Sequence, residues 1–141
     1  LQGLPRGTKL EVLVFNERIV PVFGKLTTFG AGQRKTLLET MEQLITDDGI
    51  ATYPVLQQAL DVAGAKDTTA WKSGPDEILF LTVNVPTAGE VTDAELVAGG
   101  MALRARLRMV TVHTVGSDYH PYELCRQLAA RTGGVYVDLT R

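Results

Sequence analysis

Serine, aspartate and histidine stand close together in the stretch GSDYHP (116–121), and they are the residue types of a nucleophile, an orienting acid and a base. The members of such a triad usually come from separate loops, because neighbours in sequence rarely bring all three side chains into line. The chain also contains no G-x-S-x-G turn, which presents the nucleophilic serine in many hydrolases. We therefore interpret Asp118 or His120 as a cap of the helix that starts near Pro121, and we predict no catalytic residue.

A second motif, GAGQRKT (30–36), resembles a phosphate-binding loop because it joins glycines to a Lys-Thr pair. That loop needs a glycine directly before its lysine, so that backbone amides can surround the phosphates, and Arg34 stands there instead. The motif also follows a proline-containing strand rather than a central one. We interpret it as the start of a helix and expect no cofactor.

The two histidines and the single cysteine do not form a pattern of metal ligands. His113 alternates with apolar residues in VTVHTV, so it points to one face of a strand, and neither histidine has a carboxylate at ligand spacing. Cys125 falls on the expected buried stripe of a helix, where a thiol is an inert core group. The residues themselves thus predict no metal and no enzymatic activity.

Length and charge exclude several classes of function. A chain of 141 residues is expected to form one domain with a sizeable core, and its net charge of −2 gives no electrostatic basis for binding nucleic acid or an anionic membrane. The longest hydrophobic stretch, Ile78 to Val85, is too short to cross a bilayer, so direct membrane insertion is not expected. The start of the chain, LQGLPRGTK, lacks the apolar run of a signal peptide and has no initiator Met.

Apolar periodicity and turn residues predict strands that alternate with helices. The expected strands are residues 9–15, 18–23, 77–83, 109–116 and 135–139. The first expected helix covers residues 33–46, and its inward stripe is Leu37, Leu38, Met41, Leu44 and Ile45. Thr52 is expected to cap the second helix. The third helix covers residues 91–108 with Thr92 as its cap, and the fourth covers residues 120–134 and ends at Gly133.

The order of these elements predicts the fold class. Pro21 cannot donate to a strand ladder, so the first two strands are expected to form a hairpin at one edge of the sheet. The second half runs strand, helix, strand, helix, strand, which requires right-handed parallel crossovers, and its most apolar strand, 77–83, is expected to be central. The prediction is a three-layer αβα sandwich around a mostly parallel, doubly wound, Rossmann-like sheet with one antiparallel edge strand.

Four segments in this order carry a family resemblance: LPRGTKLEVLVFNERIVP, ILFLT followed by VPTAGEVTD, VTVHTVG, and CRQLAARTGGVYVDL. Together they resemble a von Willebrand factor A domain of the bacterial type, and the likeness covers nearly all of the chain. The resemblance implies a doubly wound sheet with helices on both faces. It also implies a role in adhesion or complex assembly, which in the family often depends on a metal-ion-dependent adhesion site.

The residues that would build this metal site are largely replaced. The family takes its ligands from an Asp-x-Ser-x-Ser run, which is absent here, from a threonine loop and from a Thr-Asp-Gly turn. In the threonine loop Ile50 takes the metal-facing position, although Thr52 could partly substitute, and in the turn Thr82 is followed by Val83 and Asn84. Because a valine cannot coordinate Mg²⁺, we expect a degenerate site without metal.

The resemblance also implies that the chain, residues 1–141, is a single domain that lacks the family's first strand. That strand lies in the middle of the family's sheet, where unpaired backbone groups are too costly to leave open. Two alternatives remain: the strand lies upstream in the intact protein, or a partner or a second copy supplies it.

The predicted function is a non-enzymatic protein-interaction or assembly module with a protein or oligomer partner. Its binding residues are expected on the loops at the carboxyl ends of the strands: Thr52, Tyr53, Thr82, Val83, Asn84, Thr87, Asp118, Tyr119 and His120. One alternative is a structural subunit whose loop crevice is vestigial. Another, less favoured, is a nucleotide or phosphoester hydrolase on a related fold, for which Asp118 and Glu90 are the only candidate residues.

Overall fold

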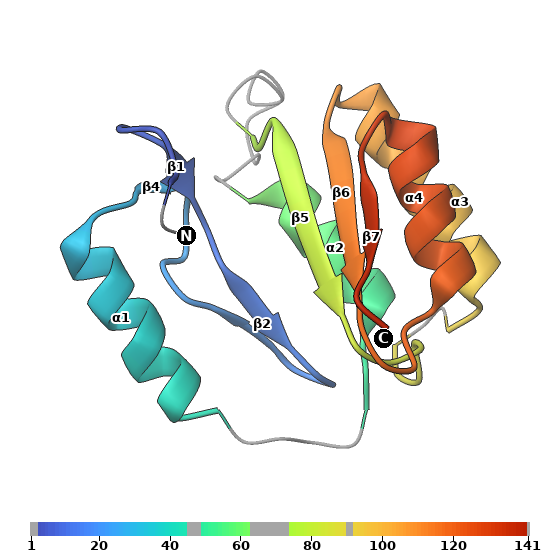
Figure 1. The fold of residues 1–141 in the computed structure, drawn as a ribbon, viewed down its shortest axis with the longest axis horizontal. Coiled ribbons are helices and arrows are strands. Elements are labelled where there is room, and N and C mark those ends of the chain that lie inside the picture. Colours follow the sequence, from blue (N-terminus) through green and yellow to red (C-terminus); the bar gives the residue numbers. More distant parts are fainter. Residues whose placement is uncertain (1–2, 45–48, 63–73, 90–91, 141) are drawn as a thin grey trace.

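The protein has a mixed α/β fold (Figure 1). Its computed structural model describes residues 3–44, 49–62, 74–89 and 92–140. The strands are β1 (Lys9–Leu10), β2 (Leu13–Phe15), β3 (Ile19–Pro21), β4 (Thr27–Thr28), β5 (Glu77–Thr82), β6 (Thr111–Gly116) and β7 (Tyr136–Asp138). The helices are α1 (Ala31–Glu42), α2 (Thr52–Asp61), α3 (Ala94–Leu107) and α4 (Tyr122–Thr132). Most of the connection expected over residues 64–76, including its tryptophan, falls outside the described residues.

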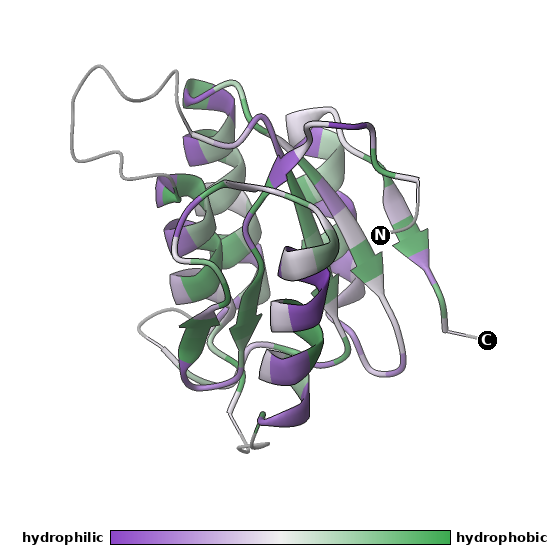
Figure 2. Ribbon diagram, turned by 90° about the vertical axis from the view of Figure 1, so that its left-hand side faces the viewer, coloured by the Kyte–Doolittle hydropathy of each residue, from purple (hydrophilic) through white to green (hydrophobic). Residues whose placement is uncertain are grey.

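The second half of the chain forms a sheet whose strands are parallel, as its alternation of strands and helices predicts, and their order is β5-β6-β7. Leu81 pairs with Val115, which in turn pairs with Val137. The middle strand is β6, so the prediction that residues 77–83 are central is wrong for this sheet, where β5 lies at an edge. In Figures 1 and 2 the helices α2, α3 and α4 lie on one side of these strands.

The core lies between this sheet and the three helices. Its largest fully buried side chains include Met101 of α3 and Leu124 and Leu128 of α4. Gly99 lies close to α4, since a Cβ there would be 3.3 Å from Arg131 Nη1, whereas a Cβ on Gly100 would make an ordinary contact, 3.9 Å from Tyr53 Cε2 of α2. Glycine has a low helix propensity, and the contact beside Gly99 gives a reason for its presence inside this helix.

No described element covers the opposite face of the sheet, and much of that face is apolar. Along β5 the side chains alternate, so that Phe80 and Thr82 are buried while Leu79 and Leu81 are 61% and 60% exposed. Val83 and Val85, which follow β5, are also exposed, and so are Val135, Val137 and Leu139 in and beside β7. In the described residues, helices thus cover one face of the parallel sheet, and the three-layer sandwich stays a prediction.

The first half of the chain forms two small antiparallel sheets, β1-β4 and β2-β3. The predicted hairpin pairing is confirmed, because β2 and β3 pair with Leu13 opposite Pro21, but the hairpin forms a sheet of its own rather than one edge of the parallel sheet. Helix α1 buries Leu37, whereas Leu38 and Met41 are exposed, although all three belong to the predicted inward stripe. The stripe is partly exposed because no described element packs against that side of α1.

The helix ends differ from the predicted caps at three places. Ala51 rather than Thr52 is the N-cap of α2, and Pro121 rather than Asp118 or His120 is the N-cap of α4. Helix α3 is capped by Asp93 rather than Thr92.

Asp93 makes the better cap because its Oδ1 accepts hydrogen bonds from Glu95 N and Leu96 N, both at 3.0 Å. At the end of α4 the prediction is confirmed: Gly133 adopts the left-handed conformation, with φ of 76°. In the part of the chain that the structure describes, no helix is long and apolar enough to cross a membrane.

The buried thiol of Cys125 makes the stability of the fold sensitive to alkaline pH. Burial raises its pKa from 9.0 to about 12, so the folded state keeps the neutral thiol while the unfolded chain ionises. The thiol's contribution is fully present below about pH 9 and is lost as the pH rises toward 12, at up to about 1.4 kcal/mol per pH unit. Urea unfolding of wild type and Cys125→Ala from pH 8 upward should show a steeper loss for wild type, and parallel curves would contradict this.

Candidate functional site

The loops at the carboxyl ends of the strands are tied to one another through backbone hydrogen bonds. Ala51 N donates to Asn16 O at 2.8 Å, which joins the loop after β2 to the start of α2. Thr87 N and Ala88 N both donate to Ile50 O, at 3.0 and 3.1 Å, and Thr87 Oγ1 accepts from Ile50 N at 2.9 Å. Thr87 therefore holds the loop after β5 against the loop before α2, as a shared site requires.

The turn after β5 is shaped by Thr82. Its side chain is buried, and its Oγ1 donates to Asn84 O at 3.0 Å. Its carbonyl accepts from Ser117 N at 3.1 Å, which joins this turn to the loop after β6. The side chain of Val83, in contrast, is 51% exposed and points away from the core.

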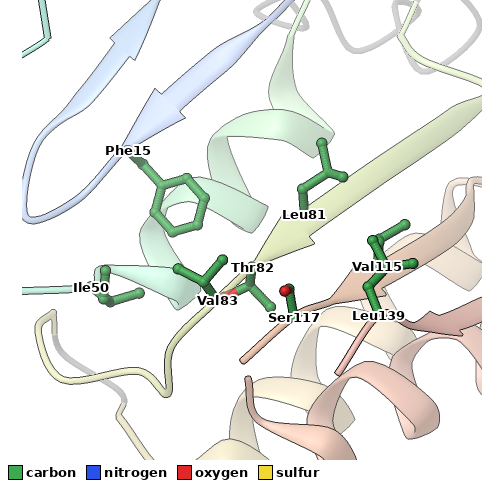
Figure 3. A pocket seen from close by; sticks show the side chains of 8 residues that line it. All are labelled: Phe15, Ile50, Leu81, Thr82, Val83, Val115, Ser117 and Leu139. Carbon is green, nitrogen blue, oxygen red and sulfur yellow. The ribbon is translucent and has the colours of Figure 1, made fainter. Parts of the chain in front are cut away.

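A pocket of about 220 Å³ opens beside this turn, between β2 and β5 (Figure 3). Apolar side chains form most of its wall, and the hydroxyl groups of Thr82 and Ser117 are its polar side-chain groups. The complete lining is Phe15, Ile50, Leu81, Thr82, Val83, Val115, Ser117 and Leu139. A pocket of this composition suits the side chains of a polypeptide better than a small charged ligand.

The oxygen atoms available at this turn do not form a ligand set for a divalent cation. Mg²⁺ requires several hard oxygen ligands in octahedral order, but Thr82 Oγ1 is engaged with Asn84 O and the neighbouring Val83 offers no oxygen. Within residues 3–44, 49–62, 74–89 and 92–140, no group of three or more His, Cys, Asp or Glu side chains could hold a metal ion.

Thr52 and Tyr53 lie deeper than a binding role on the loop surface requires. Thr52 has no exposed surface, and its Oγ1 has no hydrogen-bond partner among the described residues. Tyr53 faces α3, where its ring lies against Gly100 and the Arg104 guanidinium carbon lies 5.9 Å from the ring centroid. Neither residue lines the pocket, so Thr52 and Tyr53 serve the packing of α2 in this structure.

His120 is held in place by two hydrogen bonds rather than left facing solvent. Its Nε2 lies 2.6 Å from Tyr136 Oη, and its Nδ1 lies 3.2 Å from Thr140 Oγ1. Thr140 Oγ1 donates to Asp118 O at 3.3 Å, so we assign the histidine proton to Nδ1 and the phenolic proton to the bond with Nε2. Tyr119, next to it, is 86% exposed at the tip of the loop.

The rings of His120, Tyr122 and Tyr136 form a cluster that joins β7 to the loop after β6. The centroids of His120 and Tyr136 are 5.8 Å apart, and those of Tyr122 and Tyr136 are 5.6 Å apart in an edge-on arrangement. Burial, followed by the nearby Asp138 carboxylate, raises the pKa of Tyr136 to about 12. The Tyr136 phenol is therefore protonated at physiological pH and can donate its hydrogen bond to His120.

The predicted site residues are thus brought together in part. Thr82 and Val83 line the pocket, Thr87 joins the loop after β5 to the loop before α2, and Tyr119 is exposed on the loop after β6. The sequence alone did not identify Phe15, Leu81, Val115, Ser117 and Leu139 as pocket residues. The binding role of the predicted residues stays a prediction.

Comparison with known proteins supports the fold. No family model and no curated protein matches this sequence. Among solved structures the chain is similar to the conserved hypothetical protein BatB from Bacteroides thetaiotaomicron, with a TM-score of 0.56 over 94% of this chain and 71% of that one. The sequence identity is 14%, so the two proteins share a fold, and the similarity reaches no further than that.

Gly116 tests the support beneath the loop after β6. A Cβ at this position would overlap the His120 ring, so Gly116→Ala must displace the ring from Tyr136. We expect the free energy of unfolding to fall by about 1–3 kcal/mol, as in other overpacked sites. Chemical denaturation measures the effect. The matched control is Gly32→Ala in α1, where a Cβ meets nothing within 4 Å, and an equal loss in both variants would contradict the assignment.

Mg²⁺ and ATP should each leave the melting temperature unchanged. The crevice lacks the oxygen ligands for the cation, and residues 30–36 begin a helix rather than a phosphate loop. Thermal-shift measurements with each ligand in large excess test this. A stabilisation that saturates with ligand concentration would instead favour the hydrolase alternative.

Proposed function

We propose that this chain is a non-enzymatic protein-interaction module of the von Willebrand factor A type, in which the metal site is lost. In this proposal the domain binds an extended strand supplied by another polypeptide, and that strand pairs with the open edge of β5. The unpaired edge of β5, next to an apolar pocket, is the observation that carries the proposal.

Half of the backbone groups of β5 point away from its neighbour. The carbonyls of Asp76 and Thr82 accept bonds from Thr111 N and Ser117 N on the β6 side, at 3.0 and 3.1 Å. Because direction alternates along a strand, the backbone groups of residues 77, 79 and 81 point the opposite way. No other described strand pairs with β5 on that side.

Strand β2 offers a matching edge across the pocket. Val12 O and Asn16 N bond to the β3 side, at 2.9 and 3.0 Å, so the backbone groups of Leu13 and Phe15 point away from β3. Figure 1 shows β2 and β5 running in the same direction with no strand drawn between them. The rings of Phe15 and Phe80, with centroids 6.0 Å apart, join the two strands.

The side chains around this edge favour an apolar partner. Leu81 and Val115 line the pocket, and they continue into the uncovered face of the sheet through Val137. Strand addition of this kind draws affinity from backbone hydrogen bonds and specificity from pockets for alternate side chains. The partner is therefore expected to present alternating Val, Ile or Leu residues.

Two further observations support a von Willebrand type module without metal. The fold is similar to that of BatB, and the turn where the family's metal aspartate is expected carries Val83, which is half-exposed in the pocket wall. An exposed valine there suits contact with a protein surface, because apolar area supplies the favourable free energy of such contacts.

A short peptide in which Val alternates with Thr and Lys should bind this edge. We expect it to slow hydrogen exchange at the amides of Leu79, Leu81 and Phe15, because those groups gain hydrogen-bond partners. Two-dimensional NMR of the labelled chain measures the exchange. The matched control is the same peptide with an N-methyl group at every residue, which removes the N–H donors from both of its edges.

Two variants locate the contact. Leu81→Lys should weaken peptide binding about tenfold or more, whereas Leu38→Lys on α1, at a similarly exposed leucine, should not. Replacing Asn84 and Tyr119 together by alanine tests whether the loop tips take part in peptide binding. Equal protection by the N-methylated peptide, or no protection at all, would refute strand addition.

A further inference from the structure

The outer side of α3 carries an exposed row of leucines. Leu96, Leu103 and Leu107 are 66%, 60% and 75% exposed, while Val97, Met101 and Ala105 of the same helix are buried against the core. Successive positions in this row are separated by whole turns, so the three side chains lie along one line on the helix. A soluble helix rarely leaves such a row in water without a binding partner.

Gly100 completes the row and makes it symmetric. Positions 96, 100, 103 and 107 are spaced by four, three and four residues, so the pattern is the same in both chain directions. In two antiparallel copies of α3, Leu96 therefore lies opposite Leu107 of the other copy, and Leu103 lies opposite its Gly100. Gly100 has no side chain, so the row is recessed at this position, next to Tyr53 Cε2, which lies 3.9 Å from the place of the missing Cβ.

The charges beside the row agree with the same antiparallel arrangement. Glu95 and Arg106 are eleven residues apart, which places them about 20° from each other on the same flank of the helix. An antiparallel partner brings Glu95 of each copy next to Arg106 of the other, and it also opposes the two helix dipoles. Two other arginines are turned toward α2, since Arg104 lies over Tyr53 and Arg108 donates to Leu60 O at 2.6 Å.

We propose that α3 is the interface of a symmetric homodimer, with a second copy of this chain as the occupant of the leucine row. The same patch then serves both copies, as a two-fold interface requires. The helices lie on the opposite side of the sheet from its uncovered face, so the dimer keeps both open faces accessible (Figure 2). This inference stands independently of strand addition at β5, but it would make the assembly bivalent for such strands.

Sedimentation equilibrium of the chain over a range up to about 1 mM tests the proposal. We expect a monomer–dimer equilibrium in wild type. Leu103→Asp should raise the dissociation constant about tenfold or more, because it places a carboxylate in the recess of the partner copy. Leu79→Asp is the matched control, as Leu79 is equally exposed but lies on the sheet face, and it should leave the dissociation constant unchanged.

A charge exchange tests the orientation. Glu95→Arg alone should weaken the dimer by bringing it next to Arg106 of the other copy, and the double variant Glu95→Arg with Arg106→Glu should restore it. A chain that stays monomeric throughout the concentration range would overturn the proposal. So would an association that Leu79→Asp abolishes and Leu103→Asp does not, and so would a double variant as weak as the single one.

Discussion

The hydrogen-bonding requirement of the β5 backbone governs the structure around it. Strand β5 satisfies one side through β6, and the groups of residues 77, 79 and 81 turn the other way with no described strand to receive them. The exposed Leu79 and Leu81, the apolar pocket and the separation of β2 from β5 all lie at this same place. A strand that entered there would pair with backbone on both sides and cover part of this apolar surface.

On the side of the sheet that the helices cover, the described elements pack against one another. Helices α3 and α4 pack closely through Gly99, and buried Thr114 of β6 donates its hydroxyl to Cys125 O of α4 at 2.8 Å. The loops after β5 and β6 are joined to this body through Ser117 N and Thr82 O. The closely packed part of the domain thus presents the open edge.

Local patterns in the sequence were enough to predict α4, its end at Gly133, and the parallel direction of β5, β6 and β7. They could not place residues 77–83 within the sheet. An apolar run has the same appearance whether both faces are buried or one face is uncovered. The contact between His120 and Tyr136 was also beyond prediction, because it joins residues sixteen apart in sequence that only the packing of β7 brings together.

Amide hydrogen exchange in the chain alone tests the open edge most directly. The account predicts rapid exchange at Leu79 and Leu81, whose N–H groups point away from β6, and strong protection at Phe80 and Thr82 in the same strand, whose groups point toward it. An alternating pattern along one strand would establish that β5 has a neighbour on one side. Equal protection at all four amides would show that the edge is already paired, and it would contradict the central claim.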